Sequence, residues 1–281
     1  MMMERRTVAI VGLGLIGGSM ALALRRRTGH RLIGIDRNPA ACEAALQQEA
    51  VDEAGGPALL ASADIVVLAL APQHLIPFIT ENIDTISPGT IVTDVCGVKH
   101  EIVSVCEPIC EKHGLFFVGG HPMAGKEHSG FGNADADLFV GASYILTPTD
   151  QTNERALDMI KGLASQMGCT RLTVTTPQQH DRVIAFTSQL PHVLAGAYVT
   201  SPTCPQYHGF SAGSYRDVSR VATVDEHLWS RLFLLNAGPL CDEIDGLIER
   251  LSQYREAIAS RDCGQLENIL AQGRRRKEEN P

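Results

Sequence analysis

The chain has 281 residues, of which 44% are hydrophobic and 20% charged, so it has the composition of an ordinary globular protein and the length of two domains. Its formal net charge of −8 argues against a surface built to bind nucleic acid, although a local positive pocket for an anionic small molecule is compatible with it. The eight cysteines form no C-x-x-C pair, so we expect no metal site and a reducing, cytoplasmic environment.

The first apolar segment, residues 8–24, follows two arginines and therefore resembles a signal peptide or a short membrane span. It contains four glycines, however, and runs directly into three consecutive arginines without a convincing cleavage site. These features favour a strand, a glycine turn and a helix. We therefore expect no membrane partner.

The glycine turn reads GLGLIG at residues 12–17, a G-x-G-x-x-G element between a predicted strand and a predicted helix. In such an element Gly12 permits the tight turn, Gly14 lets the backbone approach a pyrophosphate, and Gly17 allows close packing of helix on strand. The amides of Leu15 and Ile16 lie at the start of the helix, where a phosphate is favoured. The sequence therefore predicts a dinucleotide site.

The next predicted strand, residues 31–36, ends in an acidic residue at the spacing expected for a ribose-binding carboxylate. Asp36 would accept hydrogen bonds from both ribose hydroxyls and repel a 2′-phosphate, which favours NAD over NADP. Arg37 follows directly and weakens this preference, because an arginine at this place can hold the extra phosphate.

Strands and helices continue to alternate up to residue 149. We predict further strands at 63–70, 89–95, 115–120 and 143–149, with helices at 71–83 and 98–114. This pattern indicates a Rossmann-type, doubly wound α/β domain over residues 1–149. Ligands of such sheets bind beyond the carboxyl ends of the strands. We therefore add Ala71, Pro72, Asp94 and Gly97 to the predicted cofactor contacts and place residues 119–125 near the nicotinamide.

The second half of the chain is predicted to be helical, with a helical domain over residues 150–273 and a solvated, frayed tail over 274–281. The helix at 178–201 is apolar on nearly all sides and contains Pro191, which should bend it. The few other helices predicted for this domain cannot cover all sides of such an apolar helix. We therefore expect a homodimer that forms through the helical domain.

Three side chains are candidates for the chemistry. His121 follows a strand at the nicotinamide end of the sheet and suits a general base, although a histidine that only caps a turn is the plain alternative. His192 on the apolar helix needs a polar partner and is equally explained as a core residue. Arg220 suits a carboxylate and is spaced to pair with Asp217, with Arg216 as its rival. The other histidines, His180 among them, are interpreted as surface or structural.

Five blocks occur in the order found in the prephenate and arogenate dehydrogenases of tyrosine biosynthesis, and the chain resembles that family over nearly its whole length. The blocks are GLGLIGGS with Asp36, TDVCGVK, GGHPMAGKEHSG, SQLPH, and YRDVSR followed by Trp229. The resemblance implies an oxidoreductase that carries out NAD(P)-dependent oxidative decarboxylation, with NAD and prephenate preferred here and arogenate as the alternative. It assigns the base to His121 and further catalytic contacts with the substrate to His192 and Arg220. It places Lys126, Glu127, Gly213 and Trp229 at the substrate pocket.

One block departs from the family pattern. The family has a serine that contacts the catalytic histidine, whereas DVCGVK has Gly97 at that place and Cys96 before it. A dinucleotide-binding sensor without catalysis is therefore an alternative, which the retained histidines and Arg220 disfavour. A β-hydroxy acid dehydrogenase is also disfavoured, because such enzymes need a lysine in the second domain and residues 150–270 contain only Lys161, near the start of that domain.

Overall fold

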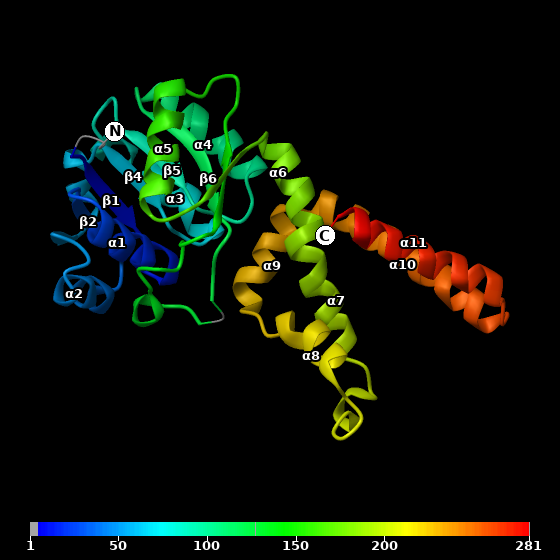
Figure 1. The fold of residues 1–281 in the computed structure, drawn as a ribbon. Coiled ribbons are helices and arrows are strands. Elements are labelled where there is room, and N and C mark those ends of the chain that lie inside the picture. Colours follow the sequence, from blue (N-terminus) through cyan, green and yellow to red (C-terminus); the bar gives the residue numbers. More distant parts are fainter. Residues whose placement is uncertain (1–4, 127, 281) are drawn as a thin grey trace.

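The computed structural model describes residues 5–126 and 128–280 and has two parts, a sheet flanked by helices and a helical extension (Figure 1). The sheet has eight strands in the order β3-β2-β1-β4-β5-β6-β7-β8. Their bounds are β1 Thr7–Val11, β2 Arg31–Ile35, β3 Glu53–Gly55, β4 Ile65–Leu68, β5 Ile91–Asp94, β6 Phe116–Pro122, β7 Ser143–Thr147 and β8 Arg171–Val174. The helices of this part are α1 Leu15–Arg27, α2 Pro39–Gln47, α3 Pro72–Asn82, α4 His100–Lys112 and α5 Glu154–Gln166.

All neighbouring strands are parallel except β6 and β7, which are antiparallel. The predicted doubly wound α/β sheet is thus confirmed. Alternate residues of β1 belong to opposite faces: Val8 and Ile10 join one buried cluster, and Ala9 and Val11 join the other. A strand that is apolar on both faces is what a sheet covered by helices on each side requires.

The sheet continues beyond the point where the sequence analysis ended it. Strand β8 pairs with β7, and α5 packs against β6 and β7, so the division expected at residue 149 falls inside the sheet part. Every residue of β8 is exposed. An exposed edge strand carries no continuous apolar run, which is why its sequence read only as a short extended piece. Strand β3 was also missed, since it has only three residues.

The helical part comprises α6 Pro177–Ile184, α7 Leu190–Val199, α8 Gly213–Ser219, α9 Glu226–Leu235, α10 Ala237–Ala259 and α11 Cys263–Glu279. The predicted helix at 178–201 is interrupted by a π-helical turn, Ala185–Gln189, which ends two residues before Pro191. Proline has no N–H to donate to the preceding turn, and an irregular turn accommodates this loss.

Helices α10 and α11 form a hairpin that projects away from the sheet (Figure 1). Residues 274–279 of the segment predicted as a frayed tail are instead the last part of α11, and they are exposed as expected; Pro281 lies outside the described residues. The Asp262 side chain accepts a hydrogen bond from the Gln265 N–H at 2.9 Å, and Arg274 pairs with Glu278 one turn later at 2.8 Å. Capping and a pair of this spacing stabilise a helix whose last segment has no apolar anchors.

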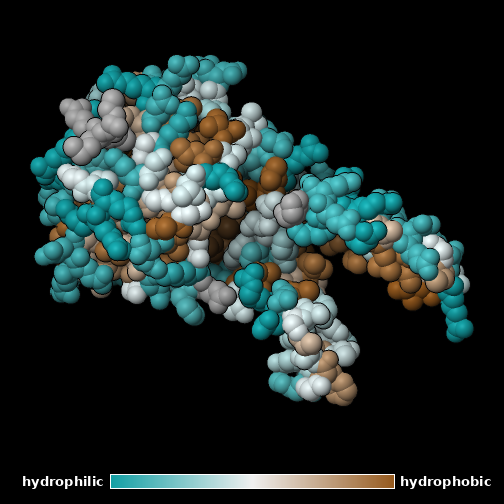
Figure 2. Space-filling view, in the orientation of Figure 1, coloured by the Kyte–Doolittle hydropathy of each residue, from teal (hydrophilic) through white to brown (hydrophobic). Residues whose placement is uncertain are grey.

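Large apolar side chains remain exposed on the helical part. Phe186, Leu194 and Tyr198 of the apolar helix are 58%, 41% and 46% exposed. The α10–α11 hairpin exposes Ile248, Leu251, Ile258 and Leu270, and Figure 2 shows hydrophobic residues along one side of it. No helix among the described residues combines the length and the apolar character needed to cross a bilayer.

Candidate functional site

The turn between β1 and α1 needs glycine at its first and last positions. Gly12 has φ +92°, and a Cβ there would lie 2.3 Å from the carbonyl oxygen of Ala69. A Cβ on Gly17 would lie 1.9 Å from the carbonyl oxygen of Gly12. Both contacts are with backbone, so only glycine fits.

Gly14, the middle glycine, has a different environment. A Cβ built on it meets nothing within 4 Å. Gly14 is also the N-cap of α1, where no side chain caps the helix and the first turn holds no acidic residue. The first amides of the helix, including those of Leu15 and Ile16, have no intrahelical partner. Open space next to free amides fits the pyrophosphate of a dinucleotide.

Replacing Gly14 by Ala is expected to leave the free energy of unfolding nearly unchanged and to weaken dinucleotide binding by ~10-fold or more, because the methyl group would occupy the space kept for the phosphates. Gly17→Ala is the matched comparison, since it should destabilise the fold itself. Urea unfolding and titration with NAD measure the two effects. Equal affinity of Gly14→Ala and the wild type for NAD would contradict this assignment.

Asp36 is held at the carboxyl end of β2 by two backbone amides. One carboxylate oxygen accepts from Leu13 N–H at 2.7 Å, and the other accepts from Asn38 N–H at 2.8 Å. A carboxylate oxygen has two lone pairs, so each retains capacity for a ribose hydroxyl. Arg37 beside it is exposed. The site therefore suits a ribose and keeps a cation next to it.

The predicted contacts that follow β4 and β5 differ in accessibility. Ala71 is the N-cap of α3 and Pro72 its first residue, at the carboxyl end of β4. Asp94 at the end of β5 is fully buried, and its carboxylate accepts from the Lys99 ammonium, from Cys96 N–H at 2.9 Å and from Gly120 N–H at 3.3 Å. The predicted contact of Asp94 with the cofactor stays a prediction, and its buried carboxylate oxygens are already engaged within the protein. Its carboxylate supports the loop from inside.

Lys99 ties the ends of β5 and β6 together. It is fully buried, forms an ion pair with Asp94 and donates to the carbonyl oxygen of Gly120 at 2.7 Å. This contact fixes the residue before His121 relative to the loop that contains Gly97. A Cβ on Gly97 would lie 3.8 Å from His121 Nε2 and 3.6 Å from Leu232 Cδ2 of α9. The site is thus closed on one side by the helical part.

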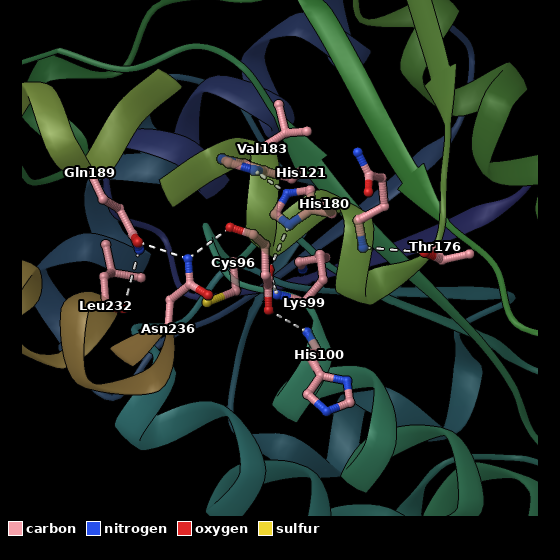
Figure 3. A network of polar contacts seen from close by, with 12 residues as sticks. Cys96, Lys99, His100, His121, Thr176, His180, Val183, Gln189, Leu232 and Asn236 are labelled. Atoms are coloured by element: carbon pink, nitrogen blue, oxygen red, sulfur yellow. Dashed lines mark hydrogen bonds and ion pairs between the residues drawn. The ribbon is translucent and has the colours of Figure 1, made fainter. Parts of the chain in front are cut away.

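His121 lies at the end of β6, and its ring points toward His180 of α6 (Figure 3). His121 Nδ1 lies 2.9 Å from His180 Nε2, and His180 Nδ1 lies 2.7 Å from a carboxylate oxygen of Asp181. The Asp181 oxygens also accept from the backbone N–H groups of Lys99 and His100, at 2.7 and 2.8 Å. A chain of three side chains therefore joins the candidate base to the start of α4.

The electrostatics of this chain favour a neutral base. Burial is the main cause that holds the pKa of His121 well below its ordinary value, and the nearby His180 and Lys99 lower this pKa further. Burial also lowers the pKa of His180, although its hydrogen bond to Asp181 opposes that shift. At neutral pH both rings are thus uncharged, and His121 is ready to accept a proton. Burial raises the pKa of Cys96 to about 11, so its thiol stays protonated and is no nucleophile.

The interpretation of His180 as surface or structural was incomplete. It is 2% exposed and contacts the candidate base. No local motif signals this, because the two histidines are 59 residues apart in the chain and come from different parts of the fold.

His192 and Trp229 come together as a pair. Their rings stack at 3.7 Å between centroids with an interplanar angle of 29°, and His192 Nδ1 lies 2.7 Å from the carbonyl oxygen of Ser188. His192 therefore has the polar partner that its position demanded. Trp229 lies on α9 three residues before Leu232, which borders Gly97, so one helix connects this pair with the His121 site.

The remaining predicted substrate contacts are exposed. Arg220 begins a 3₁₀ turn that packs on α7, and Gly213 begins α8. Asp217 pairs with Arg216 at 3.6 Å, so the expected pair with Arg220 is not formed among the described residues.

Lys126 forms an ion pair with Asp135 at 2.8 Å, and Asp135 N–H in turn donates to Ser19 Oγ of α1 at 2.9 Å. Lys126 thus lies on the dinucleotide side of the site. Glu127 is outside the described residues.

Comparison with known proteins divides the chain into the same two parts, the sheet part and the helical part. Residues 20–172 match the model of the prephenate dehydrogenase nucleotide-binding domain, and residues 176–272 match the prephenate dehydrogenase dimerization domain. The chain is 30% identical to the prephenate dehydrogenase of Bacillus subtilis over 269 residues, which cover 92% of this chain and 72% of that protein.

Two solved structures are similar over nearly their full length. The prephenate dehydrogenase of Aquifex aeolicus, crystallised with hydroxyphenyl propionate and NAD⁺, has a TM-score of 0.89 and 30% identity, covering 99% of both chains. The arogenate dehydrogenase of Synechocystis has a TM-score of 0.85 and 31% identity, covering 98% of this chain and 100% of that one. With a glycine-turn nucleotide site, a half-buried histidine at its edge and both domain models matched in order, the chain belongs to the prephenate dehydrogenase family of oxidoreductases.

Proposed function

We propose that the protein is an NAD-dependent prephenate dehydrogenase that forms 4-hydroxyphenylpyruvate and CO₂. The observation that carries this proposal is His121, a ring with a lowered pKa, at the end of β6, held through Nδ1 with Nε2 facing the loop of Gly97. Oxidation of a ring hydroxyl needs a neutral base at such a place, since a proton must leave as the hydride does.

The chain's own part in the reaction is to hold the substrate and move one proton. NAD, when bound, supplies the acceptor for the hydride that leaves the hydroxyl-bearing ring carbon. His121 Nε2 takes the hydroxyl proton. The ring carboxylate then leaves as CO₂, its bonding electrons aromatise the ring, and the oxygen regains a proton from His121. One proton is thus borrowed and returned, and the charges balance.

We assign the substrate contacts to the residues around this base. Arg220 suits bidentate binding of a carboxylate, because its guanidinium has no ion-pair partner among the described residues. The stacked pair of His192 and Trp229 forms a wall that continues along α9 toward Gly97. Gly213 and Lys126 complete the proposed pocket.

Arogenate is the second candidate substrate, and the similarity to the Synechocystis arogenate dehydrogenase favours it. Prephenate is preferred, because the curated relatives from Bacillus subtilis and Lactococcus lactis, at 30% and 28% identity, are prephenate dehydrogenases. NAD is preferred over NADP on account of Asp36, whose carboxylate would repel a 2′-phosphate.

Turnover assays test these choices directly. The purified protein is mixed with each substrate and each cofactor in all four combinations, and the absorbance of the reduced cofactor is followed. The highest kcat/KM is expected for prephenate with NAD. A dinucleotide-binding sensor would turn over neither substrate, and an arogenate dehydrogenase would prefer arogenate.

We also propose a homodimer through the helical part. The exposed apolar residues of α7, α10 and α11 lie in the segment that matches a dimerization domain. Burial of such residues in an interface stabilises the complex by roughly 25 cal/mol for each Å² of apolar surface removed from water, so leaving them exposed is unfavourable. A mass measurement in solution should give twice the mass of the chain; a monomer at assay concentrations would exclude this arrangement.

The pH dependence of kcat/KM should reflect the lowered pKa of His121. The base must be neutral in the free enzyme, and burial keeps it neutral below its ordinary pKa of about 6.5. Activity is therefore expected to persist as pH falls through 6.5 and to be lost only well below it. An acid limb centred at or above 6.5 in the pH profile would contradict this.

Gly97→Ser is expected to raise kcat/KM by ~10-fold, because its hydroxyl would lie beside His121 Nε2 and would hydrogen-bond the substrate hydroxyl, holding it against that nitrogen. A Cβ at this position makes only ordinary contacts, 3.6 Å to Leu232 and 3.8 Å to His121, so the serine fits without strain. Gly97→Ala is the matched control and should bring no gain. An equal rate for the serine and alanine variants would show that the hydroxyl has no such role.

A further inference from the structure

We infer that His180 and Asp181 are positioning residues that hold His121 in the tautomer with its proton on Nδ1 and share the charge that His121 gains. This inference rests on the proposed function for its catalytic meaning, but the tautomer itself is a property of the resting protein. The two residues come from α6 of the helical part, whereas His121 comes from β6 of the sheet. The hydrogen-bonded group that contains the base is therefore formed by residues from both parts of the fold.

The direction of each hydrogen bond follows from the Asp181 carboxylate. Its oxygens are acceptors, and they already accept from Lys99 N–H and His100 N–H. His180 Nδ1, 2.7 Å from one of them, must therefore carry the proton and donate it. A neutral ring carries one proton, so His180 Nε2 is an acceptor. His121 Nδ1, 2.9 Å away, is then the donor, and the lone pair of His121 lies on Nε2.

The charges around His121, His180 and Asp181 can compensate the positive charge of one transferred proton. Lys99 and Asp94 form a buried pair that is neutral as a unit. Asp181 then contributes one further negative charge, and it lies at the first amides of α4, where an anion is stabilised. When His121 Nε2 takes the substrate proton, the resulting positive charge faces His180 and, through it, Asp181. A buried cation without such a counterion would be strongly disfavoured.

The positions of His180 and Asp181 are fixed by a second buried layer (Figure 3). Asn236 Nδ2 donates to the carbonyl oxygen of Asp181 at 2.9 Å and to Gln189 Oε1 at 2.7 Å. Gln189 Nε2 donates to the carbonyl oxygen of Leu232 at 3.2 Å. Both amide side chains are 2% exposed. Such a satisfied buried network specifies one arrangement of α6 against α9, which is what a positioning role requires.

The first experiment needs neither substrate nor a variant. Long-range ¹H–¹⁵N correlation spectra of the ¹⁵N-histidine-labelled protein at pH 8 report which ring nitrogen carries the proton. We expect the proton on Nδ1 for both His121 and His180. A proton on Nε2 of His121 would overturn the inference, and it would do so whatever the protein's substrate is.

The second experiment compares His180→Gln with His180→Phe. The Gln side-chain oxygen can accept from His121 Nδ1–H in place of the ring, whereas Phe fills the space without an acceptor. We expect His180→Phe to lower kcat by ~10²-fold and to lose the Nδ1–H tautomer of His121, and His180→Gln to retain that tautomer and to stay within ~10-fold of wild type, both with little change in KM.

A His180→Phe variant that keeps both the wild-type kcat and the Nδ1–H tautomer would overturn the inference. Failure of the proposed function looks different: the wild type would turn over neither prephenate nor arogenate while its spectra still showed the predicted tautomers.

Discussion

Replacing His121 by Asn is expected to lower kcat by ~10²–10⁴-fold with a much smaller change in KM, because the variant loses the nitrogen that accepts the substrate proton. Asn can still donate to His180 Nε2, now 2.9 Å from the ring nitrogen, so the fold around the site should persist. Steady-state kinetics with prephenate and NAD measure the loss. The acid limb of the pH profile should disappear with it.

His113→Asn provides the control for this variant. His113 Nδ1 contacts the carbonyl oxygen of Ile109 at 2.8 Å at the far end of α4, and its other nitrogen lies 3.5 Å from Asp84. We expect wild-type kcat for this replacement. A wild-type rate in His121→Asn itself would show that another group accepts the proton.

Replacing Lys99 by Met is expected to lower the free energy of unfolding by about 3–5 kcal/mol, because it leaves the Asp94 carboxylate buried without a countercharge. The ammonium also donates to the carbonyl oxygen of Gly120, next to His121, so activity should fall together with stability. Urea unfolding followed by circular dichroism at pH 7 measures the loss of stability.

Two comparisons identify the buried charge as the cause. The double variant Lys99→Met with Asp94→Asn should be more stable than Lys99→Met alone, since it removes the charge left unpaired. Lys161→Met removes an exposed pair with Asp158, whose side chains are 34% and 73% exposed, and should cost no more than about 1 kcal/mol. A double variant that is less stable than Lys99→Met would contradict the argument.

Features encoded by short stretches of sequence were predictable. The glycine turn at residues 12–17 combines three glycines at fixed spacing with a strand before and a helix after, and each glycine has the environment that its position implies. Strands such as β1, β4 and β5 were predicted because strands that are buried on both faces read as continuous apolar runs. The position of His121 at the end of β6 was predicted because this residue follows such a run directly.

Features that depend on distant contacts were not predictable. His180 lies in a polar stretch, and only folding brings it to His121, 59 residues earlier in the chain. Asp94 follows a strand as a ligand-binding residue would, yet Lys99 turns it inward. Strand β8 is exposed on both faces and gains its place in the sheet from pairing with β7. In each case the contact that determines the residue's place comes from elsewhere in the chain, or the same local pattern is compatible with two different structures.

The most direct test of the proposed function is the product balance of one reaction. The purified protein is incubated with prephenate and NAD, and reduced cofactor, CO₂ and 4-hydroxyphenylpyruvate are quantified together. The three products are expected to appear in equal amounts, and His121→Asn is expected to form all three far more slowly. Absence of turnover, or reduced cofactor without an equal amount of CO₂, would contradict the proposed function.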